Sequence, residues 1–305
     1  MIAKYSSNSR QDLLNAQEKL KKLPRLKFFL ASLKIEISGI LVPESKYLLF
    51  SFEDEKSTFW IGYKRLLQST HIHVAVIGDF NQKSFETFTL DTLRDSEVLE
   101  DLLPLNDLTA LGDPQGIQAL KTLLGDRGIH VDSNETFLLF SFPEIIDPPE
   151  ICLPHGYFVD KIREQDIPLV MDTWKYGSPS EEEQIRVRIE KLGTVCIRQN
   201  SSQLANHVGF AAGFALLEHD GSIIHLYVLP GYRGRKLRDA IFPVLAYKAQ
   251  KKFGIEPFFC CLRENNIMLN WAQEEWKVLD DNGDHYAVDW LSISIDEFRK
   301  EFLSQ

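Results

Sequence analysis

Residues 225–238 read HLYVLPGYRGRKLR, and this stretch decides how the second half of the chain folds. The apolar letters up to Leu229 are typical of a buried strand, and Pro230 ends its hydrogen-bonding ladder. The turn that follows contains Gly231 and Gly234, and a helix is expected to begin after it. The stretch therefore predicts a strand, a tight turn and a helix in succession.

The predicted turn is rich in positive charge. Four basic residues occur within six positions: Arg233, Arg235, Lys236 and Arg238. The first turn of a helix has unpaired N–H groups and the positive end of the helix dipole, which together bind phosphate. Because basic side chains at a helix start oppose the dipole, a bound anion is expected to compensate for them. The alternative is a basic connection that only faces solvent.

The composition limits the class of protein. The chain has 305 residues, 44% hydrophobic and 26% charged, the balance of a globular protein of two domains, or one. A net charge of −10 argues against a nucleic-acid-binding protein, which needs a basic surface. The four cysteines form no CxxC pair, so neither a disulfide framework nor a zinc site is predicted, and a reducing compartment is expected.

No apolar run approaches the length of a membrane span, and the longest, Val208–Leu217, contains two glycines. The N-terminus has no apolar signal core, so secretion is not expected. Lys4, Arg10 and nearby serines resemble an organelle transit peptide, whereas Asp12 and Glu18 argue against one. The cytoplasm is the expected compartment, with the mitochondrion as the alternative.

A proline-rich segment separates two halves. Pro143–Pro154, PEIIDPPEICLP, has four prolines in twelve residues and cannot form a helix or a central strand. We interpret it as the linker between a smaller α/β domain, residues 1–145, and a second domain, residues 155–305.

Caps and apolar patterns predict the elements of the first half. The predicted helices are Ser9–Leu23 and Pro114–Leu124. The predicted strands are Lys34–Val42, Tyr47–Phe52, His71–Ile77 and Thr136–Phe142. The letters LLFSF occur at 48–52 and again at 138–142. We interpret them as two buried strands drawn from one small alphabet, not as a repeat.

The second half alternates strands and helices more regularly. The predicted strands are Tyr157–Ile162, Thr194–Arg198, His207–Leu217, Ser222–Leu229, Phe258–Leu262 and Tyr286–Ile293. The predicted helices are Asp166–Trp174, a helix capped at Ser178–Ser180 that ends near Leu192, one from the basic turn to Phe253, and Asn265–Lys277. The order β-α-α-β-β-β-α-β-α-β predicts a mixed α/β sandwich.

The stretch Leu226–Leu237, LYVLPGYRGRKL, is similar to the signature of the GNAT superfamily of acyl-CoA-dependent N-acyltransferases. Residues 171–196, with WKYG at 174–177, RIEK at 188–191 and TVC at 194–196, resemble the corresponding stretch of the glycine N-acyltransferase family. The first half resembles that family's N-terminal domain in layout. The resemblance implies a mixed-sheet, GNAT-like α/β fold in the C-terminal half, preceded by a smaller α/β domain of related layout.

The resemblance also implies that acyl-CoA is the co-substrate. An R-x-x-G-x-G/A loop holds the pyrophosphate in the family, and the matching positions are Arg233, Gly234, Arg235, Lys236, Leu237 and Arg238. The backbones of Leu226, Tyr227 and Val228 would pair with pantetheine and the thioester carbonyl. Asn265 matches the asparagine near the pantetheine arm. This sequence departs from the pattern at Lys236, where glycine is expected, and at Arg238, where glycine or alanine is expected.

The proton-transfer positions also differ from the family pattern. Many relatives have a glutamate as base eight residues before the proline, and here that position is Ser222. His225 is the candidate base, since the ordinary histidine pKa lies near the working pH. Strand alternation puts His225 on the opposite face from Ser222 unless a bulge turns the strand. Residues 218–220 at the hairpin are candidates that act through water, and Ala272 replaces the family's acidic tyrosine.

The expected function is acyl transfer from acyl-CoA to the amine of glycine or another small amino acid by direct attack. One alternative is an acyl-CoA-binding module whose catalysis has lapsed, and another is a protein or peptide N-acetyltransferase. The expected partner is a small-molecule amine, with no nucleic acid, membrane or metal. His71 and His73 alternate on a predicted strand, and we interpret them as surface residues.

Overall fold

The computed structural model describes residues 1–303 except 22, 24–25, 41–44, 103–105, 176, 178–180 and 201–208, and leaves out the side chains of 133–134 and 303. The chain forms two compact units: unit 1 is Met1–Phe140 with Cys261–Gln305, and unit 2 is Ser141–Cys260. The chain first crosses from unit 1 to unit 2 between Phe140 and Ser141, just before the proline-rich segment. The assignment of residues 155–305 to one acyltransferase domain stays a prediction, and the compact units divide that stretch at Cys260.

Unit 1 is a mixed sheet covered by helices. Its elements up to Ser141 are β1 (Ala3–Ser6), α1 (Arg10–Leu20), α2 (Lys27–Ile37), β2 (Lys46–Glu53), β3 (Ser57–Arg65), β4 (Ser69–Gly78), α3 (Gln82–Leu93), α4 (Ser96–Leu102), β5 (Asp107–Gly112), α5 (Pro114–Gly125) and β6 (Val131–Ser141). Its strands follow the order β1-β2-β3-β4-β5-β12-β6, where β12 is Ala287–Ile293. β4 and β5 are parallel, and the other neighbours are antiparallel.

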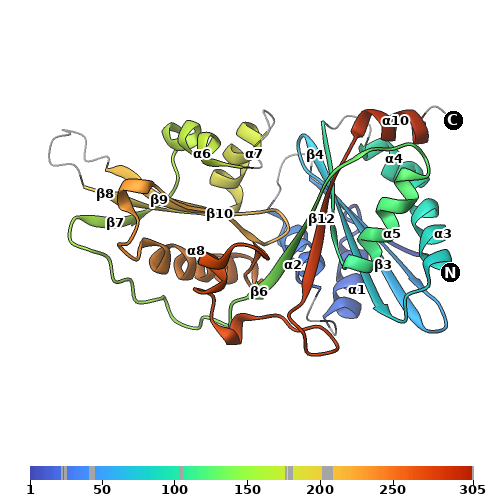
Figure 1. Ribbon diagram of the computed structural model, residues 1–305, viewed down its shortest axis with the longest axis horizontal. Helices are drawn as coiled ribbons and strands as arrows, with labels where there is room; N and C mark the ends of the chain where they lie inside the picture. Colours follow the sequence, from blue (N-terminus) through green and yellow to red (C-terminus); the bar gives the residue numbers. More distant parts are fainter. Residues whose placement is uncertain are drawn as a thin grey trace. The chain divides into compact units, whose positions relative to one another are not determined.

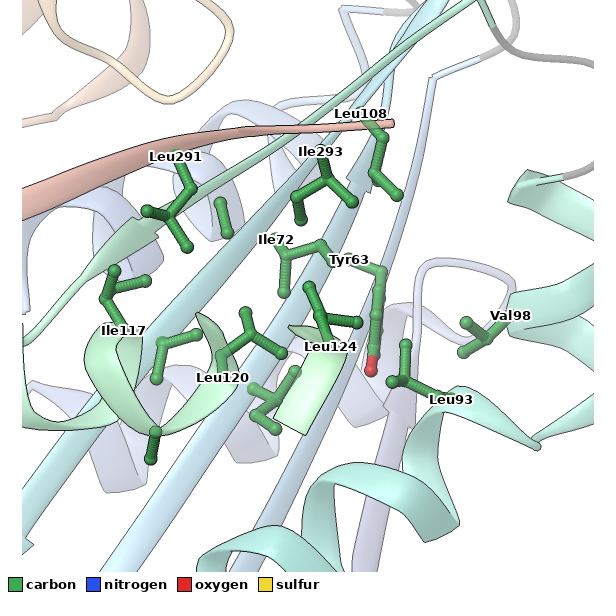
Figure 2. Packing of buried hydrophobic residues seen from close by; sticks show 14 of the residues in the cluster. Tyr63, Ile72, Leu93, Val98, Leu108, Ile117, Leu120, Leu124, Leu291 and Ile293 are labelled. Atoms are coloured by element: carbon green, nitrogen blue, oxygen red, sulfur yellow. The ribbon is translucent and has the colours of Figure 1, made fainter. Parts of the chain in front are cut away.

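Strand alternation divides the unit 1 core into two layers. Leu48 and Phe50 of β2 belong to the cluster that packs against α3 and α5. Figure 2 shows part of this cluster, with Ile72 of β4 beside Leu120 of α5. Leu49 and Trp60 point to the other face, where they pack against α1 and α2. Figure 1 shows these two pairs of helices on opposite faces of the sheet. The period-two pattern of side chains thus supports a three-layer unit.

Two expectations for unit 1 are wrong. The segment predicted as a strand at Lys34–Val42 begins instead within helix α2, because Phe29 and Leu33, one turn apart, are both buried on a helical face; residues 41–42 lie outside the described part. His73 is not a surface residue: it is completely buried, and burial lowers its pKa well below the ordinary value. The other predicted strands and both predicted helices of this half are confirmed.

Unit 2 contains an antiparallel sheet between two helical layers. Its elements are β7 (Tyr157–Asp160), α6 (Ile167–Thr173), α7 (Glu181–Val187), β8 (Thr194–Gln199), β9 (Phe210–Leu217), β10 (Ile223–Val228) and α8 (Leu237–Phe253). The strand order is β10-β9-β8-β7. α6 and α7 cover one face and α8 the other (Figure 1). The expected linker has neither helix nor strand, and the expected cap at Ser178–Ser180 lies outside the described residues.

The C-terminal elements are β11 (Phe258–Leu262), α9 (Asn266–Leu269), β12 and α10 (Ile295–Leu303). The expectation of one helix over Asn265–Lys277 is wrong, since only the short α9 and a 3₁₀ turn at Glu274–Trp276 form there. Asn266 and Asn270 are weak helix formers. β12 lies between β5 and β6 in unit 1, rather than in a sandwich with the second half. No helix among the described residues has the length and apolar character needed to cross a membrane.

The element order β-α-α-β-β-β-α-β-α-β occurs twice, once over β1–β6, with α4 added, and once over β7–β12. Each copy begins with four antiparallel strands, and in each the fourth strand has a parallel neighbour next in the chain. The predicted mixed α/β class with a preceding domain of related layout is therefore confirmed. The two LLFSF segments lie in β2 and β6, which are not equivalent strands, so they are not a trace of the repeat.

Candidate functional site

The strand, turn and helix predicted from residues 225–238 are all present. β10 ends at Val228, a single 3₁₀ turn covers Pro230–Tyr232, and α8 begins at Leu237. Lys236, the N-cap of α8, has a left-handed backbone with φ of 57°, and no side chain caps the helix. This left-handed conformation favours glycine, the residue that the motif in the sequence analysis expects at this position. Here a lysine occupies it.

The basic turn has free space around its glycines, and three of its basic side chains, Arg233, Arg235 and Lys236, are exposed to solvent. A Cβ built on Gly231 or Gly234 would meet no atom within 4 Å. Among the described residues, no carboxylate pairs with Arg233, Arg235 or Lys236. The N–H groups of Gly234 and Leu237 donate to no backbone carbonyl of a described residue. An exposed turn that has amides without backbone acceptors and cations without carboxylate partners has the chemistry of an anion site.

The arginine side chains are ordered by aromatic neighbours. The Arg233 guanidinium lies 5.7 Å from the Tyr227 ring centre, and its Nε donates to the Val228 carbonyl at 3.1 Å. Arg235 donates to the Tyr157 hydroxyl and lies within 6 Å of two tyrosine rings, those of Tyr157 and Tyr232. Arg238 contacts Asp239 at 3.5 Å. The cations at the turn are thus held in place while remaining exposed.

β10 has an outer edge without a strand partner. It pairs with β9 on one side, whereas on the other side Ser222 makes a single parallel bridge to Phe258, at the point where β11 begins. Beyond that bridge, no described strand pairs with the outer edge of β10. The backbone of Leu226 and Tyr227 is therefore exposed to hydrogen bonding by an extended ligand. The Val228 carbonyl already accepts from Arg233.

His225 lies in an irregularity of β10. The register shifts between Ile224 and Tyr227, and His225 has a positive φ of 48°, which is rare for a non-glycine residue. A bulge, which the sequence allowed only as the exception to strand alternation, is thus present. The expected pKa near the working pH is wrong. Burial lowers the pKa of His225 to about 4, and the charge of Arg188 lowers it further, whereas a hydrogen bond with the backbone of Thr173 opposes this shift.

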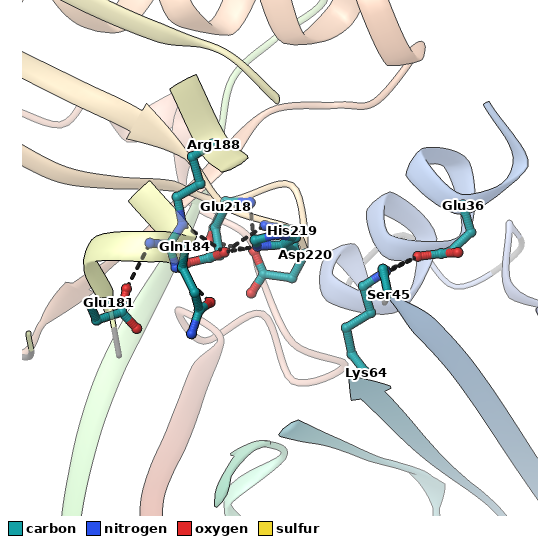
Figure 3. Close-up of polar contacts among 10 residues, drawn as sticks. Glu36, Ser45, Lys64, Glu181, Gln184, Arg188, Glu218, His219 and Asp220 are labelled. Atoms are coloured by element: carbon teal, nitrogen blue, oxygen red, sulfur yellow. Dashed lines mark hydrogen bonds and ion pairs between the residues drawn. The ribbon is translucent and has the colours of Figure 1, made fainter. Parts of the chain in front are cut away.

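The hairpin candidates form a buried polar network. Arg188 makes a two-point ion pair with Glu218, at 3.2 and 2.6 Å, and a second ion pair with Glu181 at 2.7 Å (Figure 3). Burial lowers the pKa of Arg188, but the two carboxylates outweigh it and the net shift is upward. Asp220 Oδ1 accepts the amide and the hydroxyl of Ser222 at 2.8 and 2.6 Å. The Ser222 hydroxyl thus stabilises the hairpin turn through its hydrogen bond to Asp220.

The sequence reasoning missed the residues around His225. Thr173 Oγ1 lies 3.2 Å from His225 Nε2, and the Trp174 ring centre lies 4.8 Å from that of His225. Arg188 lies 5.0 Å from the Trp174 ring and starts a π-helical turn, Arg188–Leu192, a distortion frequent at functional sites. Trp174 and Arg188 belong to the segments that carry the glycine N-acyltransferase resemblance, but no sequence signal joins them.

Two further positions lie in the C-terminal part of unit 1. Asn265 is exposed, and its Oδ1 accepts the Met268 amide at 3.3 Å as the cap of α9. Its expected contact with the pantetheine arm stays a prediction. Ala272 follows α9 and has no ionisable group, as the sequence shows.

No family model matches this sequence, and no curated protein matches it. Among solved structures, a Drosophila melanogaster protein determined as a structural genomics target is similar, with a TM-score of 0.66 and 12% identity over 97% of this chain and 99% of that one. A tandem GNAT protein from the clavulanic acid biosynthesis pathway (TM-score 0.47, 9% identity) covers 96% and 98%. A putative acetyltransferase from Pyrococcus horikoshii (0.47, 13%) covers 96% and 88%. The likeness to the Drosophila protein shows a shared fold over the whole chain.

Proposed function

We propose that this protein is an acyl-CoA-dependent N-acyltransferase that transfers an acyl group to the amine of a small molecule. One observation carries the proposal: an exposed turn begins helix α8 directly after a strand whose outer edge is open, and its Arg233, Arg235 and Lys236 have no carboxylate partner among the described residues. Such a turn suits a pyrophosphate, and such an edge suits the amide-containing pantetheine arm.

The residues of unit 2 have distinct roles in this proposal. Arg233, Lys236 and the first amides of α8 bind the phosphates. The backbone of Leu226 and Tyr227 hydrogen-bonds the extended arm and orients the thioester. The amine nitrogen attacks the thioester carbon, so that a C–N bond forms while the C–S electron pair leaves with sulfur. His225 Nδ1 accepts the proton lost by nitrogen and passes it to the thiolate, which gives the free thiol.

The low pKa of His225 is compatible with this role in one respect. A histidine with a pKa of about 4 is neutral at pH 7, so its lone pair is available. It is a weak base towards a free ammonium, and it accepts a proton more readily from the far more acidic nitrogen formed after attack on the thioester. Ser222 has no role in proton transfer in this proposal, because its hydroxyl donates to Asp220.

The acceptor we propose is glycine or another small amino acid, supported by the resemblance of residues 171–196 to the glycine N-acyltransferase family. The test is release of the coenzyme thiol from acetyl-CoA and benzoyl-CoA across a panel of amino acids, simple amines and peptides. Release with glycine supports the proposal, and release with peptides alone favours the peptide acetyltransferase alternative. No release with any pair at high enzyme concentration would refute the transferase assignment. The cytoplasmic or mitochondrial location stays a prediction.

A binding module without turnover is the second candidate. The Ser222 hydroxyl donates to Asp220 in the hairpin turn, and Ala272 has no acidic group. The residues at the two positions where the family has a base and an acid therefore cannot transfer a proton. Calorimetric titration with acetyl-CoA, beside the turnover assay, separates the two candidates. Binding of acetyl-CoA without turnover would identify the protein as a binding module, and turnover would identify it as an enzyme.

A further inference from the structure

The hydrogen bond between His225 and Thr173 determines which ring nitrogen carries the proton. The Thr173 hydroxyl donates to the Leu169 carbonyl at 2.8 Å, the back-bond of a helical threonine. Having used its hydrogen there, Thr173 Oγ1 can only accept from His225 Nε2, 3.2 Å away. Nε2 therefore holds the hydrogen, and Nδ1 has the lone pair.

His225 Nδ1 is buried and makes no hydrogen bond to any described residue. A buried polar atom without a partner is costly and rare in a native fold. The same residue has a positive φ at the bulge of β10, a second unfavourable feature. Two such costs at one residue, on the strand with the open edge, point to a ligand that supplies the missing donor.

Aromatic contacts hold the plane of the ring. Trp174 contacts it with ring centres 4.8 Å apart, and Phe214 meets it edge-on at 5.3 Å. Trp174 is itself held by Arg188, whose guanidinium lies 5.0 Å from the indole. Arg188 is almost completely buried and fixed by two carboxylates, those of Glu181 and Glu218. A chain of contacts thus runs from this ion-pair network to the imidazole.

We infer that Thr173 and Trp174 are positioning residues for His225: Thr173 fixes the Nε2–H tautomer, and Trp174 fixes the ring plane, so that Nδ1 is offered to the amine. The inference rests on the proposed function for the identity of the donor. Among the residues that the structure describes, the charged or titratable groups facing the ring are Arg188 and Tyr227.

The test is the tautomer of His225, read from ¹⁵N chemical shifts of the full-length protein with its histidines labelled and assigned. The wild type should show the Nε2–H form. Thr173→Val removes the hydroxyl at nearly constant volume and should populate the Nδ1–H form, whereas Thr173→Ser should keep Nε2–H. An Nδ1–H tautomer in the wild type, or an unchanged tautomer in Thr173→Val, would overturn the inference.

Kinetics with the best acceptor of the panel give a second measurement. Thr173→Val should lower kcat at least tenfold, while the KM for acetyl-CoA changes less than twofold; Thr173→Ser should restore most of kcat. An equal loss in Thr173→Val and Thr173→Ser, or a loss confined to KM, would count against positioning. If no amine is acetylated, the proposed function fails, while the tautomer measurement still decides whether Thr173 sets the protonation of His225.

Discussion

Arg233 is the residue on which coenzyme binding should depend most directly. It is exposed, it has no carboxylate partner among the described residues, and it lies where β10 ends. Arg233→Glu should weaken acetyl-CoA binding at least tenfold, because a charge-assisted contact contributes about 1.5–3 kcal/mol and the new carboxylate repels phosphate. Calorimetric titration measures this.

The matched control for Arg233→Glu is Lys251→Glu, the same charge change at the exposed far end of α8. It should leave the affinity within about twofold, because exposed charges farther apart than a Debye length of about 8 Å are screened at physiological salt. Equal affinity of Arg233→Glu and the wild type would show that the turn binds no coenzyme.

The pKa of His225 predicts a pH dependence of stability. The unfolded histidine, with a pKa of about 6.5, binds a proton that the folded one, at about 4, does not. Stability is therefore retained above pH 6.5 and falls as the pH drops towards 4. Between pH 7 and pH 5 the wild type should lose about 2 kcal/mol more unfolding free energy than His225→Gln. Parallel pH profiles in urea denaturation would contradict the buried, neutral histidine.

At the scale of elements, the start of α8 combines charge with strain. Lys236 is left-handed, a conformation that costs a non-glycine residue roughly 1–2 kcal/mol. After allowance for the entropy of glycine, Lys236→Gly should stabilise unit 2 by roughly 1 kcal/mol. Arg235→Gly is the control, since Arg235 does not have a positive φ and should gain no stability. Thermal unfolding compares the two, and a loss of stability in Lys236→Gly would refute the assignment of strain.

The two copies of the repeated element order differ at the corresponding strand pair. β4 pairs with β5 along six residues, from the pair of Ser69 with Asp107 to the pair of Val74 with Gly112. The strand β10 meets its parallel neighbour β11 at one bridge only, between Ser222 and Phe258. The connection after β4 is short and has an acidic residue, Asp79, and the Asn81 side chain caps α3 by accepting the Ser84 amide at 3.1 Å. The unit 1 copy thus has neither an open edge nor a basic, uncapped helix start.

At the scale of the whole molecule, this contrast predicts one acetyl-CoA site per chain, in unit 2. Titration should give a stoichiometry of one, and Arg233→Glu should leave no second saturable site. A stoichiometry of two in the wild type would show that unit 1 also binds the coenzyme.

The position of β12 makes a further prediction at this scale. A fragment of residues 1–145 should not unfold cooperatively, because its sheet lacks the strand between β5 and β6. Adding residues 261–305 as a second polypeptide should restore a cooperative transition followed by circular dichroism. A stable fragment 1–145 would mean that β12 is dispensable for unit 1.

The sequence by itself determined the strand, turn and helix around Pro230, the cap of α1 at Ser9, the proline at the start of α5 and the order of the elements in the second half. These depend on glycine, proline and capping residues, whose effects act within a few positions. Only the tertiary structure decided the place of β12 between β5 and β6, the burial that lowers the pKa of His225, and the contact of Trp174 with Arg188. Each of these depends on contacts between residues far apart in the chain, which local propensity and periodicity do not encode.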